Sequence, residues 1–135
     1  MCGIAGIFSL TGRPVINAEA RIRKMNSLLH HRGPDDEGFS VLANGTLVLG
    51  NTRLAITGPK DPIELPTLSH DRQSVITFNG EIFDFQFHKE NMEADGIRFR
   101  TQTDTEVLNE GLRHYGNDFL TRIDGMWAFA CYNFE

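Results

Sequence analysis

The first residues of the chain hold the side chain best suited to nucleophilic chemistry. Cys2 follows the initiator methionine, so removal of Met1 leaves one residue with both a thiol and a free α-amine. An α-amine has an unperturbed pKa of about 7.7–8.0, so it can accept the thiol proton near neutral pH, directly or through a water. A thiol activated by a terminal amine is a complete nucleophile and base. On the first eight residues alone, a mobile tail with an accidental cysteine is the simpler interpretation.

A nucleophile that attacks an amide also needs hydrogen-bond donors for the negative oxygen that forms. Asn79-Gly80 offers a side-chain amide beside a glycine N–H, although this dipeptide is more often an ordinary hairpin turn. An amino-acid substrate needs an arginine for its carboxylate and a carboxylate for its ammonium group. Arg53 fits the first role, and Glu81 and Asp104 fit the second, with a solvent-facing strand arginine and a helix-terminal aspartate as the simpler alternatives. Together these residues describe a pocket for a zwitterionic amide.

The hydrophobic pattern predicts the elements that must position these residues. Strands are expected over residues 4–8, 39–43, 46–56, 74–78, 81–83 and 126–132, the last buried on both faces. Helices are expected over residues 17–32, 84–94, 103–116 and 119–123, with Asn17 and Thr103 as N-caps. Residues 58–72 are expected to form a long surface loop. Hairpins that alternate with helices indicate antiparallel sheet covered by helices, which is an α+β fold.

The composition narrows the class of protein. The 135 residues are 40% hydrophobic and 23% charged, as in an ordinary soluble globular domain. The net charge of −5 argues against nucleic acid or an anionic membrane as a partner, since either would need a basic patch. Two cysteines, Cys2 and an apolar-flanked Cys131, do not make a disulfide framework, and the N-terminus has no signal peptide or membrane span. We expect a cytoplasmic protein that binds a small molecule or another protein.

No metal site is predicted. His30 and His31 are adjacent and would point to different sides of a helix, whereas a site needs its ligands to converge. The simpler interpretation is that these histidines and Arg32 lie in the last turn of the first helix, where cations suit the helix dipole.

Six ordered motifs resemble the class II glutamine amidotransferase domain, and most of all the N-terminal glutaminase domain of glutamine-hydrolysing asparagine synthetases. The resemblance runs from Cys2 to about Tyr132. The motifs begin at Met1 (MCGIAGI), His31 (HRGPD), Arg53 (RLAI), Asn79 (NGEI), Thr103 (TDTEV) and Asp124 (DGMWAFA).

The resemblance implies a four-layer αββα sandwich of the N-terminal nucleophile hydrolase type. It implies that Cys2 is the nucleophile and that its α-amine is the base. Asn79 and Gly80 would form the oxyanion hole, while Glu81 and Asp104 would hold the ammonium group of glutamine. Arg53 would bind the glutamine carboxylate, and the residues after it would shape the surrounding loop: Leu54, Ala55, Ile56 and Thr57. The implied reaction forms a thioester, releases ammonia and then yields glutamate, with no metal or organic cofactor in this domain.

The sequence departs from the family pattern at three places. Phe83-Asp84 replaces the usual tyrosine and asparagine after Asn-Gly-Glu-Ile, and the segment 62–66 lacks the common Gln-Pro pair. The chain also stops at Glu135, so we expect residues 1–135 to be an amidotransferase domain that is truncated at its C-terminus, without a synthetase domain.

The expected partners follow from that interpretation. L-Glutamine would be the substrate, and an ATP-dependent synthetase domain, in the same polypeptide or another, would activate the ammonia acceptor. ATP and Mg²⁺ are expected only in that synthetase domain, and an oligomer is compatible with the sequence. Two alternatives stay open: a catalytically silent interaction module, and a glutaminase unit that serves an acceptor other than aspartate.

Overall fold

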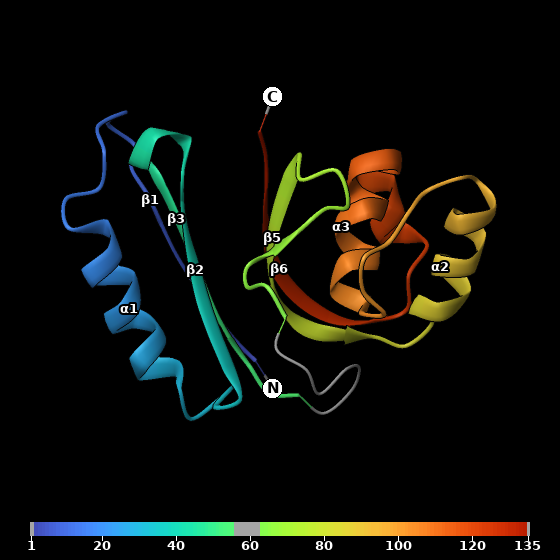
Figure 1. Ribbon diagram of the computed structural model, residues 1–135, viewed down its shortest axis with the longest axis horizontal. Helices are drawn as coiled ribbons and strands as arrows, with labels where there is room; N and C mark the ends of the chain where they lie inside the picture. Colours follow the sequence, from blue (N-terminus) through green and yellow to red (C-terminus); the bar gives the residue numbers. More distant parts are fainter. Residues whose placement is uncertain (1, 56–62, 135) are drawn as a thin grey trace.

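The computed structural model describes residues 2–55 and 63–134. Figure 1 shows that it has four layers, two sheets packed together with helices on both outer faces. The first sheet has the antiparallel order β1 (Gly3–Phe8), β3 (Leu47–Arg53), β2 (Asp36–Leu42). The second has the antiparallel order β4 (Thr67–Leu68), β5 (Ser74–Ile82), β6 (Gly125–Asn133). Helix α1 (Ala18–Leu29) covers the outer face of the first sheet, and α3 (Asp104–Tyr115) covers that of the second. The predicted α+β fold and its αββα layering are confirmed.

Two apolar clusters hold these layers together. The larger lies between the second sheet and its helices, with α2 (Phe85–Ala94) packed against α3 and a short 3-10 helix, η2 (Gly116–Thr121), closing one end. Its fully buried members include Ile76 and Leu108, and burial of each such side chain is worth about 1.5–3 kcal/mol. A smaller cluster of Leu42, Leu49 and Val75 joins the two sheets. The sheets are therefore packed face to face, and β1 and β3 contact β5.

The predicted boundaries agree with the structure better for α3 than for α1. Thr103 accepts a hydrogen bond from the Glu106 N–H at 3.3 Å, so the predicted N-cap of α3 is confirmed. Asn17 precedes α1 in a left-handed conformation but makes no side-chain capping bond. Helix α1 ends at Leu29, so the two histidines and Arg32 follow the helix instead of lying in its last turn.

Strand β5 runs through Asn79-Gly80 without the predicted break. Asn79 pairs with Ala128 and Gly80 with Trp127, so the dipeptide is not a hairpin turn. A Cβ atom at Gly80 would lie 2.7 Å from the Trp127 Cα and closer still to the Met126 carbonyl oxygen. The close approach of β6 explains the glycine here. Asn44-Gly45, in contrast, does sit in the hairpin between β2 and β3, within the 3-10 turn η1 (Ala43–Gly45).

Strand β6 is not buried on both faces, which corrects the prediction. Trp127 and Phe129 pack against the helical layer, whereas Met126, Ala128 and Ala130 on the opposite face are exposed. The reason is that β6 is an edge strand, and the first sheet packs over its neighbour β5. No helix in the described part of the chain is long and apolar enough to cross a membrane.

Candidate active site

One cavity opens where β1, β3, β5 and the start of α3 come together. It contains five of the residues predicted to act on the substrate, together with six others. Its lining consists of Cys2, Asn51, Arg53, Leu54, Ile63, Leu65, Phe78, Gly80, Thr103, Asp104 and Thr105. Residues far apart in the sequence thus place a thiol, a guanidinium and a carboxylate around one small space.

Cys2 is held in place by its neighbours and is not part of a mobile tail. The Arg32 Nε donates to the Cys2 carbonyl oxygen at 3.1 Å, and the Asn51 Nδ2 donates to the Gly3 carbonyl oxygen at 2.9 Å. A Cβ at Gly3 would lie 2.6 Å from the Thr52 Oγ1, so only glycine allows β1 to pack this closely. Cys2 is half-buried and lines the cavity together with Phe78 and Gly80 of the other sheet.

Arg53 lies at the end of β3 with only 6% of its surface exposed. Its Nη1 donates to the Asp36 Oδ2 at 2.9 Å, which fixes the guanidinium against the neighbouring strand. The chain then turns away, and the Ala55 N–H donates to the Asp35 Oδ2 at 2.7 Å. A guanidinium is planar, carries five N–H donors and can bind a carboxylate through two of them.

Asp104 is the first residue of α3 and is partly buried. Its carboxylate accepts the Ile82 N–H at 3.1 Å and the Thr105 N–H at 2.8 Å. Burial raises the pKa of this carboxyl, the two backbone hydrogen bonds counteract the rise, and the charge of Glu81 adds to it. A cation that entered the cavity would favour the ionised form of Asp104, so the site is prepared for a positive group.

The other predicted residues lie less centrally. Asn79 lines a neighbouring hollow that shares Gly80 with the main cavity, and its Oδ1 is buried without a hydrogen-bond partner in the described chain. Neither Glu81 nor Ala55 lines the cavity. Glu81 is exposed, and Ala55 is partly buried. Ile56 and Thr57 lie outside the described residues. The part that each of these four would play with substrate stays a prediction, as it does for Asn79.

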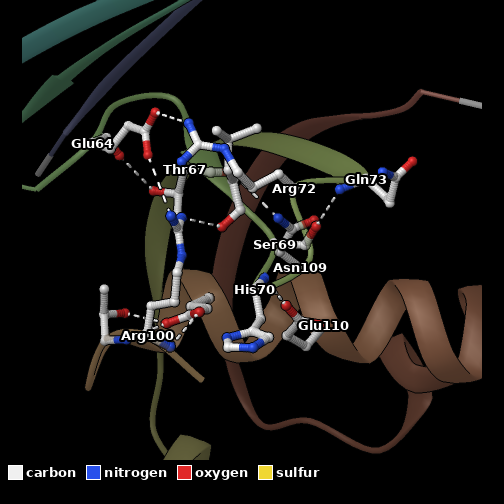
Figure 2. Close-up of polar contacts among 12 residues, drawn as sticks. Glu64, Thr67, Ser69, His70, Arg72, Gln73, Arg100, Asn109 and Glu110 are labelled. Atoms are coloured by element: carbon white, nitrogen blue, oxygen red, sulfur yellow. Dashed lines mark hydrogen bonds and ion pairs between the residues drawn. The ribbon is translucent and has the colours of Figure 1, made fainter. Parts of the chain in front are cut away.

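The segment 63–73, which carries Leu65 of the cavity wall, is tied to α3 by the polar contacts in Figure 2. Within α3, the Asn109 Nδ2 donates to the Thr67 carbonyl oxygen at 3.3 Å, and Glu110 accepts the His70 N–H at 2.5 Å. Arg100 donates to the Leu68 carbonyl oxygen at 3.0 Å. The described part of the predicted surface loop is a loop apart from the two-residue strand β4 (Thr67–Leu68), and it is partly buried because α3 supplies polar partners for its backbone.

Several lining residues were not predicted from the sequence. Asn51 stands two residues before Arg53, and the two-residue period of a strand puts both on one face, so this signal was present. Thr103 and Thr105 flank Asp104; Thr103 was predicted only as a helix N-cap, and Thr105 had no predicted role. Ile63, Leu65 and Phe78 could be found only from the tertiary fold. Within residues 2–55 and 63–134, no three His, Cys, Asp or Glu side chains are grouped so as to hold a metal ion.

Comparison with known proteins identifies the domain. A family model described as the glutamine amidotransferase domain matches residues 1–135. The chain belongs to this family. The amidotransferase domain is 34% identical to asparagine synthetase [glutamine-hydrolyzing] 1 of Bacillus subtilis (strain 168), over 98% of this chain and 21% of that protein. It is 35% identical to a putative asparagine synthetase [glutamine-hydrolyzing] 2 of Methanocaldococcus jannaschii, over 98% of this chain and 28% of that protein.

Solved structures support the fold of the amidotransferase domain. A glutamine phosphoribosylpyrophosphate amidotransferase from B. subtilis, complexed with ADP and GMP, aligns with a TM-score of 0.67 at 20% identity, over 98% of this chain and 34% of that one. An allosteric regulatory enzyme of purine biosynthesis aligns with a TM-score of 0.74 at 19% identity, over 99% of this chain and 36% of that one. The chain thus spans about a fifth to a third of the proteins it resembles, and at these identities the structures establish the fold alone.

Proposed function

We propose that this amidotransferase domain hydrolyses L-glutamine to glutamate and ammonia through a thioester on Cys2. The observation that carries the proposal is that Cys2, Arg53, Gly80 and Asp104 line one cavity. Arg53 binds the carboxylate of glutamine, and Asp104 binds its ammonium group with the support of the Glu81 charge. Leu54 lines the cavity, and Ala55, Ile56 and Thr57 are proposed to shape the loop that follows Arg53.

The chemistry begins with transfer of the thiol proton of Cys2 to its own α-amine. The sulfur then attacks the carboxamide carbon, and the negative oxygen accepts hydrogen bonds from the Gly80 N–H and the Asn79 side-chain amide. When the carbon–nitrogen bond breaks, the α-ammonium returns its proton to the leaving nitrogen and ammonia departs. A water, activated by the same amine, attacks the thioester, releases glutamate and restores the thiol. We propose no metal or organic cofactor for this half-reaction.

The ammonia would pass to a synthetase domain, in the same polypeptide or another, that activates the acceptor with ATP and Mg²⁺. The relatives that support this step are named asparagine synthetases, of which the chain spans 21–28%. Aspartate is accordingly the proposed acceptor and the cytoplasm the proposed location.

The test is the reaction of the chain with a diazoketone analogue of glutamine, followed by intact mass and peptide mapping. We expect one adduct per chain, on Cys2, and glutamine should prevent its formation by competition. The chain should also release glutamate from glutamine, and Cys2→Ala should abolish this release. Cys131→Ala is the matched control: burial raises the pKa of the Cys131 thiol, and its loss should change neither result. A chain that the analogue does not label would contradict the proposal and favour a silent interaction module.

A further inference from the structure

Asn51 connects the strands on the two sides of the cavity. It lies on β3, the central strand of the first sheet, with 2% of its surface exposed. Its Nδ2 donates to the Gly3 carbonyl oxygen of β1 at 2.9 Å. The same nitrogen lies 3.4 Å from the Phe78 carbonyl oxygen of β5, on the opposite sheet. One amide group therefore contacts three strands from both sheets.

The two carbonyl groups that Asn51 contacts flank the proposed reacting groups. Gly3 directly follows Cys2, and Phe78 directly precedes Asn79-Gly80. Because both partners are carbonyl oxygens, the amide nitrogen of Asn51 must face them, and its two hydrogens can serve both at once. The third nearby carbonyl, that of Thr52 at 3.4 Å, belongs to the adjacent residue on the same strand.

We propose that Asn51 is a positioning residue that sets the separation between Cys2 and the oxyanion-binding pair. The inference rests on the proposed function. An oxyanion is stabilised only by donors about 2.7–3.1 Å from the position that it occupies, so the spacing between the two strands controls the reaction step. A displacement of about 1 Å at such a site can cost roughly 100-fold in rate. Substrate affinity depends instead on Arg53 and Asp104.

The structure offers a matched control at the same sheet interface. Thr77 of β5 is 1% exposed, and its Oγ1 donates to the Gly50 carbonyl oxygen of β3 at 2.8 Å. This hydrogen bond also joins the two sheets, but neither Thr77 nor Gly50 lines the cavity, and neither is adjacent in sequence to Cys2 or to Asn79-Gly80. Asn51→Leu and Thr77→Val each remove one buried inter-sheet hydrogen bond, so Thr77→Val reproduces that part of the change. Asn51→Leu also removes the hydrogen bond to the Gly3 carbonyl oxygen and should lose more stability.

The experiment measures labelling of Cys2 by the diazoketone analogue over a range of concentrations, which separates the maximal rate from the half-saturating concentration. Asn51→Leu should lower the maximal rate by about tenfold or more and change the half-saturating concentration by less than about threefold. Thr77→Val should change neither by more than about threefold. Asn51→Asp, which keeps the shape but cannot donate when ionised, should behave like Asn51→Leu and serves if the leucine variant does not fold.

Three results would overturn the inference: two of them refute the positioning role alone, and the third also refutes the proposed function. A labelled wild-type chain with an equally reactive Asn51→Leu variant, or equal losses in Asn51→Leu and Thr77→Val, would refute the positioning role alone. A wild-type chain that the analogue does not label would refute the proposed function and the positioning role with it.

Discussion

Replacement of Arg53 by lysine tests how the domain recognises its substrate. In the structure the guanidinium is 6% exposed and donates to Asp36 at 2.9 Å, so at least one of its N–H groups is already engaged. A guanidinium carries five N–H donors in a fixed plane and can make a two-point contact with a carboxylate. A lysine ammonium is a point charge that must serve both Asp36 and the substrate, so Arg53→Lys should lose one hydrogen bond to the substrate carboxylate.

The size of the effect follows from the bond that is lost. A hydrogen bond between charged groups is worth about 1.5–3 kcal/mol, which corresponds to a rise in KM of roughly 10- to 150-fold. The carboxylate of glutamine is remote from the scissile amide, so kcat should change by less than about threefold. The assay is glutamate release as a function of glutamine concentration.

Arg113→Lys is the control for this prediction. Arg113 forms an ion pair with Asp71 outside the cavity, so its replacement should leave KM unchanged. A KM for Arg53→Lys within about threefold of wild type would refute the assignment of Arg53 to the substrate carboxylate. A loss confined to kcat would refute it as well, because it would point to a part in the reaction step.

Three further predictions concern pH and packing. Burial raises the pKa of Asp104 above its unfolded value, so Asp104 takes up a proton at a higher pH in the fold than in the unfolded chain. Lowering the pH through that pKa should weaken glutamine binding to Cys2→Ala, measured by calorimetry, and a titration midpoint at or below the ordinary value of about 3.9 would contradict this. Gly80→Ala would put a Cβ 2.7 Å from the Trp127 Cα, so thermal unfolding should show a loss of about 1–3 kcal/mol, and unchanged stability would refute the pairing of β5 with β6 at this point. The backbone N–H groups of Arg100 and Thr101 donate to the two carboxylate oxygens of Glu106, and Glu106→Gln leaves at least one of them without its acceptor. Denaturant unfolding should show a loss of about 1–3 kcal/mol in the free energy of unfolding. An unchanged midpoint would contradict this.

The sequence predicted elements well where local patterns decide them. Thr103 caps α3 as expected, and the hairpin at Asn44-Gly45 joins the expected strands. It failed at Asn79-Gly80, where the local turn preference is overridden by pairing with β6, a strand more than 40 residues later in the chain. The loop prediction for residues 58–72 did not include the burial of Thr67 and Ser69, because the residues of α3 that contact this segment lie far away in sequence.

The candidate site was predictable in its residue types but not in its geometry. The resemblance named Cys2, Arg53 and Asp104, and the structure places all three around one cavity. No sequence pattern shows that Arg32 and Asn51 hold the first residues of β1, since those hydrogen bonds depend on how the loop after α1 and strand β3 meet the terminus. The register of Asn51 relative to Phe78 is likewise a property of two sheets packed together.

The central claim is that the α-amine of Cys2 activates its own thiol. The most direct measurement compares two chains: one that begins at Cys2, and one that retains Met1 so that the Cys2 nitrogen is an amide. Each is assayed for glutamate release and for alkylation by iodoacetamide. We expect glutamate release only from the chain that begins at Cys2, while iodoacetamide still alkylates the thiol of both. Equal glutamate release from the two chains would contradict the claim.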